Sequence, residues 1–278
     1  MDKNVLARNI LILSQLDDIA SAFAATGVRC ALLKGAALIL SFPSYAKTRN
    51  MEDIDLLIPP GQLAAAKEAL SRLGYRQVPE DHAAMSNPAL TAPVDILDGF
   101  WYLSKKENEA VFNGAFAHPL QGFAGCLFHL KPEDFYIHVL AHGALHHAEV
   151  DKRWKDDLSL IWDNWGKTMN WAEVEGKLKS YGFQKAVNTY LSPELAEDSF
   201  YLRMLRSQEN PFKGHITRAM FLPFMKKLAY LRSALFPSGN FLSNRYDLKT
   251  RREIMLYAFL RPFLFLKSLA LFAKRMLF

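Results

Sequence analysis

The chain has 278 residues, half of which are hydrophobic and 13% of which are aromatic. This composition supports a sizeable buried core and excludes a disordered, collagen-like or repeat protein. The only two cysteines, Cys30 and Cys126, sit among apolar neighbours, so we expect buried thiols in a reducing compartment and neither a disulfide scaffold nor a cysteine-based zinc cluster.

The formal net charge of +6 conceals an uneven distribution of charge along the chain. Residues 1–199 carry 19 lysines and arginines against 25 acids, whereas residues 200–278 carry 15 against three. The N-terminus has acids on both sides of a short apolar stretch and lacks a small-residue cleavage site, which argues against a signal peptide. We therefore expect a cytoplasmic protein with a strongly basic tail.

The beginning of the chain alternates helix and strand patterns. Apolar residues at three-to-four spacing predict a helix over 5–25, ended by Gly27. Residues 28–33 suit a buried strand, and a glycine turn then opens a helix that stops before Pro43. Residues 53–58 alternate acidic and aliphatic side chains, as expected for a further strand.

The same alternation continues to about residue 116. The patterns predict a helix over 61–74, a short strand over 92–100 and a connection with some helix over 101–116. From Lys131 onward the spacing of apolar and aromatic residues is helical. We expect an α+β protein with an α/β domain over 1–128 and a helical domain over 129–278.

Three aspartates are candidate metal ligands. Successive side chains of a strand point to opposite faces, so Asp53 and Asp55 share one face. Asp95, between Val94 and Ile96, would lie beside them if the two strands pair. Hard oxygen ligands suit magnesium, and three carboxylates would hold two ions for phosphoryl or nucleotidyl transfer. The alternative is a solvated strand end.

The upstream turn adds a second signal, because a glycine that opens a helix lets backbone N–H groups approach a phosphate. The segment LLKGAALILSFPSYAKTRNMEDIDLLIPP resembles the bacterial uncharacterised nucleotidyltransferase family of the polymerase-beta-like superfamily. The resemblance covers roughly residues 28–165 and includes the segment around Trp154 and Asp157. It implies a small mixed sheet flanked by helices, followed by a mainly helical C-terminal region.

The resemblance also implies roles for individual residues. Asp53, Asp55 and Asp95 would be the catalytic, metal-binding carboxylates, and Lys34, Gly35 and Arg49 would contact the triphosphate. The implied ligands are two Mg²⁺ ions and a nucleoside triphosphate, ATP first among them. The acceptor would be a hydroxyl on a small molecule, glycan or peptide, with no specific nucleic acid as partner.

Two positions depart from the superfamily pattern. Ala36 replaces the usual small hydroxyl residue, and Leu97 stands where relatives often have histidine. Loss of a hydroxyl removes about 0.5–1.5 kcal/mol net, whereas the carboxylates are retained, so catalysis remains the prediction. The alternative is a catalytically weak nucleotide-binding or interaction protein with the same fold.

Histidines recur along the first helix of the C-terminal region. His138, His142 and His146 fall on one helical face, with His147 one position round. Three interpretations stay open: packing, a phosphate-facing or acceptor-activating face formed around His142, and a zinc site, as in a metallohydrolase.

Arg153 and Lys155 flank Trp154 and could reach a nucleotide by charge and stacking. We include Arg153 with His142 among the candidate nucleotide contacts. The alternative for both basic residues is the solvated edge of a helix.

Two aromatic segments lie in the basic tail. Residues 221–236 alternate cations and rings, a pattern found both in nucleic-acid platforms and, more often, in helix cores. Basic residues interrupt residues 254–278, so no apolar run within this segment is long enough to span a bilayer. The segment predicts an amphipathic helix packed on its own domain or on a protein partner or the inner membrane surface.

Overall fold

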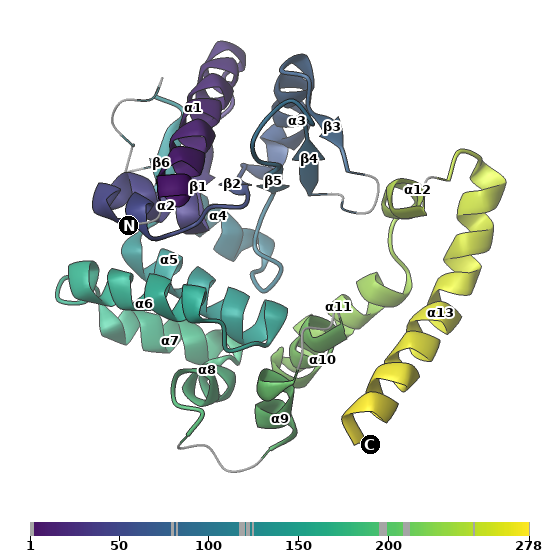
Figure 1. Ribbon diagram of the computed structural model, residues 1–278. Coiled ribbons are helices and arrows are strands. Elements are labelled where there is room, and N and C mark those ends of the chain that lie inside the picture. The colour runs from purple at the N-terminus through teal and green to yellow at the C-terminus, as the bar shows by residue number, and fades with distance from the viewer. Residues whose placement is uncertain are drawn as a thin grey trace. The chain divides into compact units, whose positions relative to one another are not determined.

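The computed structural model describes residues 3–78, 81, 83–116, 120, 123, 125–194, 199–207, 212–246 and 248–277 (Figure 1). The chain divides into two compact units, Met1–Phe135 and Tyr136–Phe278. The domain boundary that we expect between residues 128 and 129 stays a prediction.

A mixed sheet forms the centre of the first unit. Its strands are β1 (Cys30–Leu32), β2 (Ile54–Leu57), β3 (Arg76–Gln77), β4 (Ala84–Ser86), β5 (Val94–Leu97) and β6 (Leu127–His129). Their order across the sheet is β3-β4-β5-β2-β1-β6. The β2–β5 and β1–β6 pairs are parallel and the other three pairs are antiparallel.

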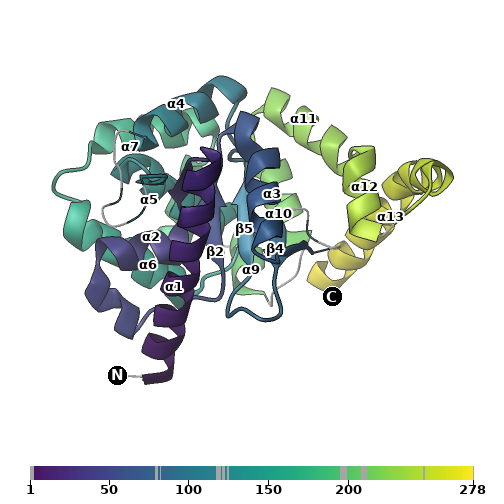
Figure 2. The ribbon, with the colours of Figure 1, turned by 90° about the horizontal axis from the view of Figure 1, so that it is seen from above.

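Helices flank this sheet. They are α1 (Lys3–Thr26), α2 (Lys34–Ser41), α3 (Leu63–Arg72) and α4 (Lys105–Ala115), with single 3₁₀ turns over Pro43–Lys47 and Pro60–Gln62. Figure 2 shows α1 and α3 side by side over one face of the sheet. The apolar stripe of α1, which includes Ile12, Leu16 and Phe23, is fully buried, so the helix is held mainly by hydrophobic packing.

The predicted α+β architecture is confirmed, with the strands that carry the acids at the middle of the sheet. Gly27 and Gly74 end the first and third helices with positive φ values of 69° and 87°, which glycine adopts without steric cost. Both cysteines are buried, as expected. The sequence patterns did not predict β3, β4 and β6, which are only two or three residues long.

The second unit is helical throughout the part that the structure describes. After α5 (Pro132–Ala141), which spans the boundary, a π-helical turn covers His142–His147. The following helices are α6 (Lys152–Trp165), α7 (Trp171–Tyr181), α8 (Gln184–Leu191), α9 (Phe200–Arg206), α10 (Phe212–Phe221), α11 (Phe224–Leu235), α12 (Gly239–Tyr246) and α13 (Arg251–Leu277). Among the described helices, none is both long and apolar enough to cross a bilayer.

The structure of the aromatic segment 221–236 does not match the helix-core interpretation of its sequence. No residue of α11, all of which the structure describes, is buried, and Phe224 and Met225 are among its most exposed side chains. The helix-core interpretation therefore does not hold for α11. The rings of Phe224 and Phe236 are exposed, whereas Tyr230 is partly buried and Leu222, just before the helix, is buried.

Candidate active site

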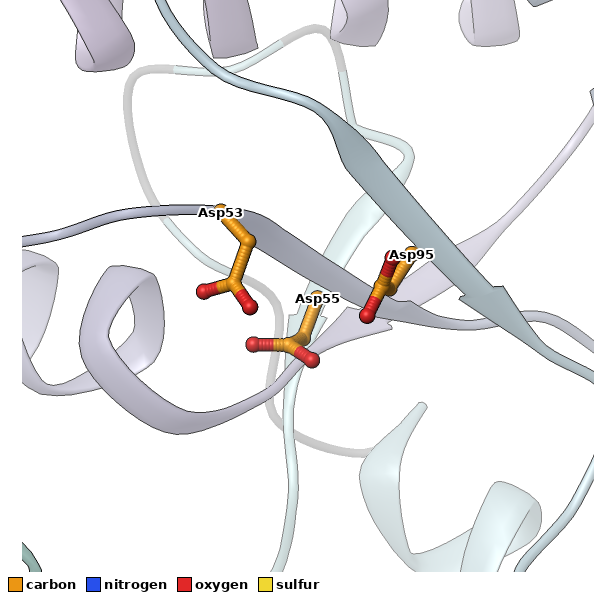
Figure 3. A group of neighbouring side chains, drawn as sticks. All are labelled: Asp53, Asp55 and Asp95. Atoms are coloured by element: carbon orange, nitrogen blue, oxygen red, sulfur yellow. The ribbon is translucent and has the colours of Figure 1, made fainter. Parts of the chain in front are cut away.

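Three aspartates meet at the middle of the sheet. Asp53 directly precedes β2, Asp55 lies within it, and Asp95 is the register partner of Asp55 on the parallel strand β5. One carboxylate oxygen of each residue lies within 4.8 Å of those of the other two. Figure 3 shows the three side chains gathered beside the paired strands. We call Asp53, Asp55 and Asp95 the acid triad.

Burial and mutual repulsion disfavour the charged forms of Asp55 and Asp95. Asp55 is only 2% exposed, and this burial, together with the charge of Asp53, raises its pKa against the opposing effect of Lys34. Burial and the charges of Asp55 and Asp53 raise the pKa of Asp95 to about 7. A cation bound between the carboxylates would remove this repulsion.

The donor set suits a hard divalent cation. All three ligating groups are carboxylates, the oxygen donors that magnesium prefers, and they come from strands that the core holds rigidly. Asp55 supplies a buried ligand, while Asp53 and Asp95 are partly exposed, so the cluster keeps access to solvent. The residues present therefore fit the metal that the sequence predicts.

Lys34 brings a positive charge to the acid triad. Its Nζ lies 2.6 Å from Oδ1 of Asp55. Burial alone would lower the pKa of Lys34, but attraction to Asp55, Asp53 and Asp95 outweighs burial and raises it. The residue is the first of α2 and has a φ of +46°, in the left-handed region. The carboxylates therefore favour the charged form of the lysine, and its backbone is strained at this position.

Gly35 and Arg49 lie together at the start of α2. A Cβ built on Gly35 would come within 3.2 Å of Cγ of Met51 and 3.8 Å of the Arg49 guanidinium carbon. No side chain caps this helix end, so its first N–H groups have no side-chain acceptor. The sequence-predicted triphosphate residues thus lie next to one another and next to the triad.

A buried amide of α1 positions the chain that enters β2. The side chain of Asn9, fully buried, donates hydrogen bonds to the carbonyls of Ala46 (2.8 Å) and Arg49 (2.6 Å). Its Oδ1 accepts a hydrogen bond from the N–H of Met51 at 3.1 Å. Asn9 therefore ties down the loop that carries Arg49 and leads directly to Asp53.

A second buried amide of α1, that of Gln15, positions the segment that leads into β5. Nε2 of Gln15 donates to the carbonyl of Ala92 at 2.6 Å and to Tyr75 Oη, while its Oε1 accepts from the N–H of Ala92 at 3.2 Å. Ala92 lies three residues before Asp95. The sequence analysis did not select Asn9 or Gln15; the available signal was a polar residue inside an otherwise apolar helical stripe.

The histidines of the second unit are arranged differently from the prediction. The α-helix becomes a π-helix at His142, and the wider turn brings the ring of His147 closest to that of His142, with centroids 4.5 Å apart. The corresponding distances from His142 are 5.2 Å to His146 and 6.2 Å to His138. His147 is therefore a neighbour of His142 rather than a residue one position round the helix.

The described histidines do not form a metal cluster. Among the described residues, the acid triad is the only group whose ligand atoms converge as a metal requires. His142 and His147 instead pack against Trp154, with ring centroids 5.2 Å and 4.7 Å away. This arrangement supports the packing interpretation, and nothing among the described histidines supports the zinc interpretation.

The remaining candidate contacts lie in the second unit. Arg153 pairs with Asp151, with Nη2 2.8 Å from Oδ2, while the buried Trp154 packs against the rings of His142 and His147. The proposed nucleotide contacts of His142 and Arg153 stay predictions.

Comparison with known proteins bears on the first unit and part of the second. The sequence model of the family described as "Uncharacterised nucleotidyltransferase" matches residues 2–197. Among solved structures, the solution structure of the antibiotic-resistance factor ANT(2'')-Ia is similar with 14% sequence identity and a TM-score of 0.47, over 70% of this chain and 100% of that one. No curated protein matches. With most of its length matched, including the acid triad and the turn at Lys34, the chain belongs to the uncharacterised nucleotidyltransferase family.

Proposed function

We propose that this nucleotidyltransferase holds two magnesium ions on the acid triad and moves a nucleoside monophosphate from ATP to a hydroxyl group of an acceptor. The observation that supports this proposal most directly is the convergence of three carboxylates from two adjacent strands. The acceptor class that we propose is a small molecule, glycan or peptide.

The residues around the triad have complementary roles in this reaction. Bound magnesium would neutralise phosphate charge and orient the reacting groups. The ammonium of Lys34, the guanidinium of Arg49 and the N–H groups at the start of α2 would hold the triphosphate, because all three present positive charge or donors beside the triad.

The transfer itself is an in-line displacement. The acceptor oxygen forms a bond to the α-phosphorus as the bond to the bridging oxygen breaks, and pyrophosphate leaves. Asp95 is positioned at the partly exposed side of the triad, and we assign it the proton of the acceptor hydroxyl. Asp53 and Asp55 would serve as metal ligands.

The direct test is ligand-dependent thermal stabilisation, since a ligand that binds the folded state raises apparent stability. Wild type, Asp53→Asn and Asp55→Asn are melted with each of the four nucleoside triphosphates, with and without magnesium. The matched control is Asp98→Asn, an exposed aspartate just beyond β5. We expect a magnesium-dependent shift with ATP in wild type and Asp98→Asn that both triad variants lose.

Turnover distinguishes the two candidate activities. Release of pyrophosphate in the presence of small-molecule, glycan and peptide acceptors supports the transferase. Nucleotide binding without pyrophosphate release from any acceptor class would favour the alternative, a nucleotide-binding protein with the same fold. Equal melting shifts in wild type and Asp53→Asn would place the nucleotide away from the triad.

We also propose that the C-terminal segment 254–278 contacts a partner outside its own unit. The chemistry of that partner follows from the surface of α13.

A further inference from the structure

Helix α13 places polar groups on the face that contacts its own unit. Nη1 of Arg261 donates a hydrogen bond to Tyr246 Oη at 2.8 Å, and the ring of Tyr257 packs on that of Tyr246 with centroids 4.8 Å apart. One turn beyond Arg261, Phe265 is buried against His215 at 5.4 Å between centroids. These residues recur at four-residue spacing, so they define one face of the helix.

The opposite face of α13 is apolar and exposed. Its large side chains are Met255, Leu256, Phe259, Phe263 and Leu266, and Phe259 and Phe263 are 70% and 61% exposed. Phe259 and Phe263 are one turn apart, with ring centroids 5.8 Å from each other. A stripe of this kind from Met255 to Leu266 is about 17 Å long at 1.5 Å per residue. Contiguous exposed apolar surface of this kind marks an interaction site.

Basic residues border this stripe. Arg251 and Arg252 precede it and Lys267 follows it, and all three are exposed. Glu253 is the only acidic residue of the helix, and its Oε2 accepts hydrogen bonds from the N–H groups of Lys249 and Thr250, so it serves as a cap. The apolar stripe therefore lies within a positively charged border.

We propose that α13 lies in the plane of an anionic lipid bilayer, with the apolar stripe in the interface and the bordering cations among the headgroups. Apolar aromatic and aliphatic side chains on one face, flanked by lysine and arginine, are the features of an interfacial helix. The described helices include none that could span a bilayer, so the contact is with the surface.

Charge decides between this partner and a second copy of the chain. Residues 200–278 carry 15 lysines and arginines against three acids, and pairing two such tails would place like charges together. A polynucleotide would require the cations along the contact face itself, whereas that face of α13 is apolar. An anionic membrane matches both the apolar stripe and its basic border.

The test is flotation of the full-length protein with vesicles of 30% phosphatidylglycerol in phosphatidylcholine, or of phosphatidylcholine alone. We expect wild type to float with the anionic vesicles and to lose most of this binding in high salt. Phe259→Gln combined with Phe263→Gln should abolish flotation. The matched control, Ile10→Gln with Leu11→Gln, removes two apolar side chains of α1 that are also more than half exposed and should float as wild type.

A separate variant tests the attraction between the basic residues that border the stripe and the anionic headgroups. Neutralising Arg251, Arg252 and Lys267 to glutamine should weaken binding to anionic vesicles by at least about tenfold, since each basic residue near the surface contributes on the order of 1 kcal/mol. Neutralising Lys105, Lys106 and Lys185, which are exposed and distant in sequence, should leave flotation unchanged. Circular dichroism and melting of every variant show whether the fold is retained.

Three outcomes would overturn the proposal. These are absence of flotation with anionic vesicles, flotation that survives the phenylalanine substitutions, and a wild-type dimer that the same substitutions dissociate. The last outcome would assign the stripe to a second copy of the chain. None of these measurements depends on nucleotidyl transfer, so failure here and failure of the proposed function are separately visible.

Discussion

The ammonium nitrogen of Lys34 lies 2.6 Å from Oδ1 of Asp55, and the lysine adopts a left-handed backbone conformation at that point. A non-glycine residue in this region costs about 1–2 kcal/mol. The ion pair offsets that cost, because Asp55 would otherwise be a buried carboxylate beside two others. Lys34 is thus the main cation that stabilises the charged form of Asp55, with a smaller contribution from Arg49.

Replacing Lys34 separates backbone strain from charge. In EDTA, Lys34→Met should lower the free energy of unfolding by about 3 kcal/mol, because it leaves Asp55 buried without its ammonium partner. The free energy of unfolding of Lys34→Gly should be higher than that of Lys34→Met by about 1 kcal/mol, since glycine adopts the left-handed conformation without strain. Chemical denaturation measures both values.

Divalent metal should rescue both Lys34 variants, because a cation on the triad replaces the missing charge. The control is Lys47→Met, which removes an exposed lysine from the same unit and should behave as wild type. Wild-type stability of Lys34→Met in EDTA would show that the ion pair is unimportant to the triad.

The pKa of Asp95 predicts how stability depends on pH. A carboxyl with a pKa near 7 in the folded protein and near 4 in the unfolded chain binds its proton more tightly when folded. The free energy of unfolding in EDTA should therefore fall as the pH rises from about 4 to about 7. Asp95→Asn should flatten this decline, as urea denaturation across the pH range would reveal; Asp98→Asn should keep it.

The buried amide of Asn9 should support both the fold and the site. Asn9→Leu removes the partner of three backbone groups and should cost about 3 kcal/mol of stability. Because the loop it holds leads to Asp53, Mn²⁺ affinity measured by calorimetry should also fall by about tenfold. Asn164→Ala, at an exposed helical site, should change stability by less than about 0.5 kcal/mol.

An Asn9 variant that loses stability but keeps full metal affinity would limit Asn9 to a structural role. The affinity measurement is made well below the melting temperature, so that unfolded protein does not contribute to the difference.

The π-helical turn depends on a close approach at Gly143. A Cβ there would lie 2.5 Å from Oη and 2.8 Å from Cζ of Tyr190, whose side chain is fully buried. Gly143→Ala should therefore cost about 2 kcal/mol or more. Gly176→Ala, within α7 and with open space around its Cβ, should instead stabilise by about 0.5–1 kcal/mol. Equal effects of the two substitutions on denaturation midpoints would contradict this contrast.

The sequence was most informative where side-chain periodicity and burial agree. The two-residue period places Asp53 and Asp55 on one face, and pairing of their strand with the strand of Asp95 brings the third acid alongside. The short strands β3, β4 and β6 have too few residues to display a period, and their pairing depends on segments distant in sequence.

Other features depended on tertiary structure. Lysine rarely adopts a left-handed conformation, so the sequence did not predict the backbone conformation of Lys34. The contact of its side chain with Asp55 accounts for that conformation. The four-residue spacing of the histidines fits an ordinary α-helix, whereas packing around Gly143 and Trp154 accompanies a π-helix. The Ser104–Glu107 capping box that opens α4 was likewise not predicted, although these two residues have the spacing of that motif.

Through its two buried amides, helix α1 fixes the positions of both strands that carry the acid triad. Asn9 holds the approach to β2 and Gln15 holds the approach to β5, although these segments are about forty residues apart in the chain. Detachment of α1 would free both approaches in one event, so amide hydrogens of β2 and β5 should exchange as one cooperative unit. The geometry of the acid triad therefore depends on hydrogen bonds made by the first helix of the chain.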